Sequence, residues 1–192
     1  MKVSSILMLL FFVIPFSYGQ ATWTADPAHS SIGFEVSHLT ISTVSGKFTD
    51  YSCDLVSKRK SFDEAQINVK VNVGSISTED LTRDKHLKED DFFNAESYPN
   101  MIFVSDSFVK TSDTEYQVTG FLTIRNVVKK ISFVATNSGT VTIGDKTISA
   151  FKAEFIVNRF DYQLKWDDTL DSGGLVVGED VTVILNIELV KS

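Results

Sequence analysis

The feature that most constrains the fold is a run of strictly alternating residues at 65–73, AQINVKVNV. Every odd-numbered position in this run is apolar, and every even-numbered position is polar or charged. Successive side chains of a β-strand point to opposite faces, so a period of two predicts a strand with one apolar face and one wet face.

The same signal recurs along most of the chain. The last run, at 181–189, alternates in the same way, and further strand signals lie at 31–38, 44–55, 101–108, 115–125, 128–136, 140–143 and 147–158. The breaks at Ser112-Asp113, Asn137-Ser138-Gly139 and Gly144-Asp145 consist of turn-forming residues and predict hairpins.

One polar segment, around 78–93, interrupts the strands and is rich in helix-forming residues. Thr78, followed by Glu79 and Asp80, is a suitable helix start, because carboxylates are favourable at the positive end of the helix dipole. Many antiparallel strands with one short helical insert predict an all-β fold, an extended antiparallel barrel of about eight strands, since closure removes exposed sheet edges. The interior could be packed by aromatic side chains or could enclose one apolar ligand, and periodicity is compatible with both.

The first residues have the pattern of a secretory signal peptide: Lys2, an apolar run from Ile6 to Phe16, and the small residues Ser17 and Gly19. We expect residues 1–19 to be cleaved and 20–192 to form one exported domain without stable membrane insertion. The net charge of −7 argues against nucleic acid as a partner. A single cysteine, Cys53, allows no intramolecular disulfide.

No residue pattern indicates catalysis or a metal site. His29 and His38 are nine positions apart, which in a regular strand places them on opposite faces, and His86 lies in the helical insert. HxH, HExxH and GxSxG motifs are absent from the sequence, so we expect no metal and no nucleophilic serine beside His29. The glycines of SGGLVVGED at 172–180 lead into a strand rather than a helix, which predicts a turn or bulge and not a phosphate loop.

Arg159 is the one unusual charge, because it continues the apolar alternation of the 147–158 strand. A buried arginine is costly unless it is paired, so we expect a nearby carboxylate partner, or contact with a ligand headgroup at the barrel mouth. We also consider His29, His38 and His86 as mouth or headgroup contacts.

Several segments together resemble the polyisoprenoid-binding YceI-like family of exported bacterial proteins. They are WTADPAHSSIGFEVSH at 23–38, VSGKF at 44–48, SISTEDLTRDKHLKEDDFFNAESYPNMIF at 75–103, VTGFLTIRNVVKKISF at 118–133, VNRFDY at 157–162 and GEDVTVILNIEL at 178–189. Asn126 and Gln163 stand where the family usually has glycine, which puts the local turn geometry in doubt.

The resemblance implies a lipocalin-like barrel in the periplasm that binds or transports a polyisoprenoid, quinone-like or fatty-acyl chain and needs no cofactor. The expected pore lining is Ile32, Phe34, Val36, Phe48, Ile67, Val69, Val71, Met101, Phe103, Leu122, Phe133, Phe151, Phe155, Val183 and Leu185. Two alternatives stay open: a periplasmic enzyme acting on a lipid-like substrate through His29, His38 or Arg159, and an adaptor with a filled barrel. An unpaired edge or an apolar mouth could support a homodimer.

Overall fold

The computed structural model describes residues 19–192, so the predicted signal peptide lies outside the described residues except for Gly19. The strands are β1 (Ala21–Ala25), β2 (Ser31–His38), β3 (Ser42–Phe48), β4 (Tyr51–Ser57), β5 (Gln66–Asn72), β6 (Ile76–Ser77), β7 (Asn100–Lys110), β8 (Glu115–Ile124), β9 (Val127–Ile143), β10 (Lys146–Asn158) and β11 (Val177–Lys191). The helical elements are α1 (Leu81–His86) and two 3₁₀ turns, η1 (Val73–Ser75) and η2 (Phe160–Tyr162).

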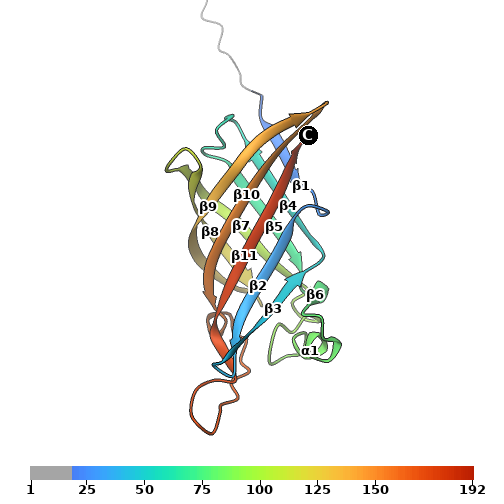
Figure 1. Ribbon diagram of the computed structural model, residues 1–192, viewed down its shortest axis with the longest axis vertical. Coiled ribbons are helices and arrows are strands. Elements are labelled where there is room, and N and C mark those ends of the chain that lie inside the picture. Colours follow the sequence, from blue (N-terminus) through green and yellow to red (C-terminus); the bar gives the residue numbers. More distant parts are fainter. Residues whose placement is uncertain (1–18) are drawn as a thin grey trace, which may run out of the picture.

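These strands form one closed antiparallel barrel (Figure 1). β1 and β2 both pair with β11, so they are two halves of one interrupted strand. β3 and β4 likewise continue each other across Thr49 and Asp50, and β5 continues through η1 into β6. Counting each interrupted strand once, the described residues make an eight-stranded barrel in sequential order, and pairing of β1 with β11 closes it. The predicted fold class is confirmed.

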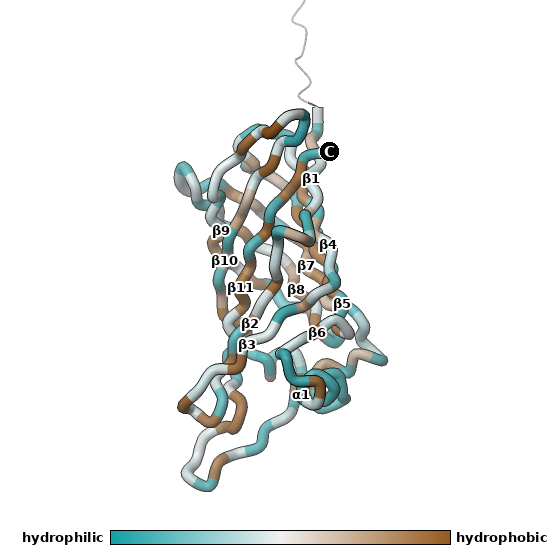
Figure 2. The backbone as a smooth tube through the Cα atoms, turned by 45° about the vertical axis from the view of Figure 1, so that its right-hand side comes forward, coloured by the Kyte–Doolittle hydropathy of each residue, from teal (hydrophilic) through white to brown (hydrophobic). Residues whose placement is uncertain are grey.

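The alternation of apolar and polar residues in the sequence places apolar side chains on the inner face of the barrel wall and polar side chains on its outer face. Figure 2 shows hydrophobic and hydrophilic residues alternating along the barrel strands. On β10, for example, Phe151 is buried and its neighbour Lys152 is exposed. This is the expected consequence of a period of two when one face encloses an interior and the other faces water.

Three local predictions were wrong. Asn137-Ser138-Gly139 is not a turn: β9 runs through it, and a bulge opposite Ala150 and Phe151 accommodates the extra residue, with Gly139 at φ 125°. The 44–55 signal covers parts of two strands separated by a bend. The helix begins after Asp80 rather than Thr78, because the Asp80 carboxylate accepts hydrogen bonds from the backbone N–H groups of Thr82 and Arg83.

No helix among residues 19–192 is long and apolar enough to cross a membrane.

Candidate functional site

An aromatic plug closes the end of the barrel where both ends of the described chain lie (Figure 1). The connection between β4 and β5 places the Phe62 ring in the barrel, where its centroid lies 5.0 Å from that of Trp23 and 5.2 Å from that of Phe151. Phe108 and Tyr116 extend the group, with centroids 4.8 Å apart. All five side chains are buried, so tightly packed aromatic side chains seal this end.

Below the plug the barrel is hollow. The volume of the cavity that is open to the centres of water-sized molecules is about 240 Å³. A site for one water molecule needs a volume of only ~10–15 Å³ measured in the same way. Inward-facing side chains such as Phe34, Val69 and Phe155 are only half-buried, because they border this space instead of packing against one another. A side-chain-filled barrel, one of the alternatives left open by the sequence, is therefore excluded.

All fifteen residues of the expected pore lining border the cavity. Their contact with a ligand stays a prediction. Strand alternation also supplies lining residues outside the expected set, including Leu55, Phe108, Val118, Ile131, Val181 and Ile187. The inward period of two already indicated most of these, since they lie on the same strand faces as the residues chosen.

Arg159 lines the cavity, and its guanidinium donates to four backbone carbonyls. Nε donates to the carbonyl of Gly178 at 2.8 Å, Nη2 to that of Val177 at 2.9 Å, and Nη1 to those of Leu164 and Trp166 at 3.0 and 2.6 Å. The expected carboxylate partner was wrong: backbone carbonyls satisfy the charge, and burial lowers the pKa of the guanidinium.

Leu164 and Trp166 lie near the start of the 163–177 loop, whereas Val177 ends it and Gly178 follows it in β11, so Arg159 closes that loop and its donors are occupied by carbonyls.

Arg125, which the sequence did not single out, has the same role for the helical insert. Its Nη1 donates to the carbonyls of Asp90, Phe92 and Gln163 at 2.6–2.7 Å, and its Nη2 lies 3.1 Å from Asp90 Oδ1. The guanidinium is buried at the end of β8. It therefore ties the insert to the loop that Arg159 closes, and the two arginines build the end of the barrel opposite the plug.

A second hollow of about 190 Å³ lies at this end. It shares Phe34, Val36, Leu87, Phe92 and Val177 with the main cavity and adds polar side chains, among them His38, Arg83 and His86. Because the two spaces share walls, the apolar interior continues toward the surface here. His86 Nε2 lies 2.8 Å from Asp91 Oδ2, and its ring packs edge-on against Phe92 and Trp166, whose rings stack at 5.7 Å. His38 and His86 are thus brought together at the mouth.

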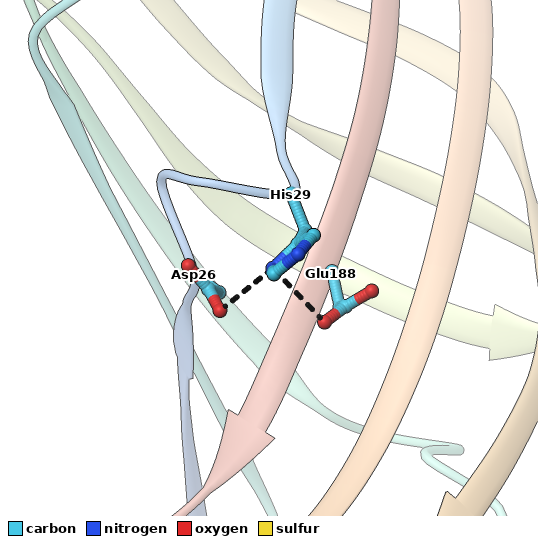
Figure 3. A group of neighbouring side chains, drawn as sticks. All are labelled: Asp26, His29 and Glu188. Carbon is cyan, nitrogen blue, oxygen red and sulfur yellow. Dashed lines mark hydrogen bonds and ion pairs between the residues drawn. The ribbon is translucent and has the colours of Figure 1, made fainter.

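His29 is not a mouth residue, which corrects its expected place. It lies on the outer wall between β1 and β2, its side chain is 64% exposed, and it contacts Asp26 and Glu188 (Figure 3). The parity argument that separated His29 from His38 assumed one continuous strand, whereas His29 lies in a turn before β2. The polar residues proposed for an enzyme, His29, His38 and Arg159, therefore do not converge on one site.

The YceI-like domain family matches residues 23–189. A UPF0312 protein of Staphylococcus aureus strain MRSA252 is 30% identical over 161 residues, 83% of this chain and 91% of the relative. Among solved structures, Burkholderia cenocepacia BcnA superposes with a TM-score of 0.73 at 19% identity, over 85% of this chain and 98% of that one.

A polyisoprenoid binding domain from Saccharophagus degradans, implicated in plant cell wall breakdown, superposes with a TM-score of 0.65 at 13% identity, over 87% of this chain and 97% of that one. These two structures share the fold at low identity, and the match of 23–189 covers nearly the whole barrel. The chain belongs to the YceI-like family.

Proposed function

We propose that this protein is an exported carrier that holds one long lipid chain in the barrel, with the mouth between the β2–β3 hairpin, α1 and the 163–177 loop. The observation that carries the proposal is the apolar character of the cavity. Of its lining residues only Lys152, Arg159 and Tyr162 have charged or hydroxyl side chains; Lys152 points outward and Arg159 binds backbone carbonyls. Such a space favours hydrocarbon and offers little to a polar substrate.

The length of the cavity favours a polyisoprenoid over a single fatty-acyl chain. Its lining on β11 runs from Val177 to Leu189, which are 12 residues apart (189 − 177 = 12). At ~3.3 Å per residue and a tilt of ~40°, a regular strand of that length would extend about 30 Å along the barrel axis, and the irregularity of β11 between Val177 and Val181 shortens this to about 25 Å. The hydrocarbon core of a bilayer, two layers of acyl chains, is ~30 Å thick, so a single acyl chain would occupy only part of the lining.

Burial of hydrocarbon supplies enough free energy without a charged clamp. Even about twenty carbons, which would fill only part of the lining, gain roughly 16 kcal/mol at ~0.8 kcal/mol per methylene. Association and ordering oppose this by ~4–15 kcal/mol. The polyisoprenoid binding domain from Saccharophagus degradans, with the same fold, further supports this class of ligand.

Tyr162 favours a ligand that carries an oxygen. Its side chain lines the cavity at 2% exposure, its hydroxyl has no hydrogen-bond partner within the described chain, and burial raises its pKa to about 12. A neutral buried hydroxyl can donate to a carbonyl or alcohol oxygen. We expect Tyr162→Phe to weaken binding of a quinone or prenyl alcohol and to leave binding of the corresponding hydrocarbon unchanged.

The direct test is native mass spectrometry of protein from its own host, followed by organic extraction, with uptake of fluorescent prenyl analogues of increasing length. Phe103→Arg should abolish uptake, and its matched control is Val104→Arg, the next residue on β7, which faces outward at 44% exposure. Val69→Asp and the outward Lys70→Asp make a second pair on β5. Absence of a co-purifying lipid together with no uptake would refute the carrier function, as would equal uptake by the two members of each pair.

A further inference from the structure

Three side chains that can ligate a metal ion meet on the outer wall of the barrel (Figure 3). Asp26 and His29 come from the connection between β1 and β2, and Glu188 comes from β11. His29 Nδ1 lies 3.0 Å from Asp26 Oδ2 and 3.8 Å from Glu188 Oε1. All three ligand atoms lie within 4.8 Å of one another, and among residues 19–192 this is the one such group.

The spacing suits a small divalent ion. Around a tetrahedral ion with bonds of ~2.0–2.1 Å, neighbouring ligand atoms are ~3.4 Å apart. The two distances from His29 Nδ1 bracket that separation, so modest side-chain rotations would bring all three atoms into coordination.

The backbone beneath these side chains is held in place. Asp26 Oδ1 accepts a hydrogen bond from Ala28 N at 2.9 Å, which leaves Oδ2 toward His29. Asp26 N donates to the Glu188 carbonyl at 2.8 Å, and Glu188 N donates to Ser30 Oγ at 2.9 Å. The connection is thus attached to β11 on both sides of His29, so little backbone ordering would be required on binding.

We propose that Asp26, His29 and Glu188 form a binding site for a divalent transition-metal ion of the zinc class, with water completing the coordination. One imidazole nitrogen and two carboxylate oxygens suit Zn²⁺, Co²⁺, Ni²⁺ or Cu²⁺ better than Ca²⁺ or Mg²⁺, which prefer oxygen alone. Binding exchanges a proton for the metal: imidazolium Nδ1–H releases its proton to solvent, and the lone pair on that nitrogen becomes the ligand. The ion would cross-link the connection between β1 and β2 to β11.

A neighbouring cation competes with the metal. The positive charge of Lys146 acts on the Asp26 carboxylate and so opposes the binding of a second cation there. We therefore expect Lys146→Gln to tighten metal binding, a change that a purely structural ion pair between His29 and Asp26 would not produce.

The test is calorimetric titration of the chelator-treated protein with Zn²⁺ in two buffers that differ in ionisation enthalpy. We expect one ion per chain, proton release, a rise in Tm, and about tenfold or greater loss of affinity in Asp26→Asn, His29→Gln and Glu188→Gln. The matched control is Asp91→Asn, which disrupts the His86–Asp91 pair at 2.8 Å and should leave zinc affinity unchanged.

Circular dichroism establishes that each variant is folded, and the ¹⁵N shift of His29 Nδ1 reports its coordination. Absence of saturable binding by Zn²⁺, Co²⁺ and Ni²⁺ would overturn the proposal. Zinc binding that is insensitive to the Asp26 and Glu188 variants would also overturn it. The two carboxylates would then serve only as ion-pair partners of the protonated His29 imidazole.

Discussion

The substitution Arg159→Met most directly tests which contacts hold the 163–177 loop at the end of the barrel opposite the aromatic plug. Arg159 is 4% exposed and donates four hydrogen bonds to carbonyls at the two ends of the 163–177 loop. Bonds from a charged donor contribute ~1.5–3 kcal/mol each, or roughly 6–12 kcal/mol for four. Desolvation of the guanidinium offsets several kcal/mol of this.

We therefore expect the substitution to cost about 3–5 kcal/mol in the free energy of unfolding, because four backbone carbonyls lose their donor at ~1–3 kcal/mol each while the desolvation cost of the guanidinium is removed. For a chain of this size, ~2–4 °C per kcal/mol corresponds to a fall in Tm of about 6–20 °C. Arg159→Lys should recover little, because one ammonium cannot reach carbonyls spread over the planar guanidinium fork.

Urea unfolding followed by fluorescence can assign the loss to the loop or to the barrel. The chain has two tryptophans, Trp23 in the plug and Trp166 in the loop, so Trp23→Phe and Trp166→Phe backgrounds report each region separately. Trp166 should lose its folded signal at lower urea than Trp23 in Arg159→Met.

The controls are Asp167→Asn and Glu179→Gln, which remove the two carboxylates whose charges act on Arg159. Screened pairs of this kind contribute ~0–1 kcal/mol. An unchanged urea midpoint in Arg159→Met, or an equal loss in either control, would refute the assignment of the charge to backbone carbonyls.

Three further outcomes are expected. Gly120→Ala should lower Tm by several degrees, because the added Cβ would lie 2.5 Å from the Val104 carbonyl oxygen; Gly33→Ala, with its nearest contact at 3.4 Å, is the milder comparison. Gln163→Gly should raise stability by up to ~1 kcal/mol, since Gln163 adopts φ 63°, and thermal unfolding should detect it. An NMR titration should place the pKa of His29 above 6.5 and should show a lower pKa in Asp26→Asn, because the hydrogen bond to Asp26 is lost. The stability that this pair contributes is fully present below pH 6.5 and is lost as pH rises through the raised pKa.

The wall of the barrel was predictable because it depends on a local property. Strand alternation assigns each side chain to a face wherever the strand lies, so Phe103, Phe155 and Val183 were identified as inward without knowledge of their neighbours. Asn126 and Gln163 adopt φ 61° and 63°, the left-handed region that favours glycine, so these two turns form without a glycine at either position. The missed bulge at Gly139 has a related cause: glycine serves a bulge and a turn equally well, and only the pairing partner distinguishes them.

The sequence by itself determined a one-sided antiparallel wall, its apolar lining and the family to which it belongs. The tertiary structure decided what that wall encloses and what lies at its ends. Phe62 closes one end from a connecting loop, Arg159 bonds to carbonyls beyond its own strand, and Asp26 meets Glu188 from the opposite end of the chain. Such contacts depend on barrel closure and on the paths of the loops, which bring together residues far apart in sequence. A local periodicity assigns a side chain to a face of a strand but does not predict which distant residues it contacts.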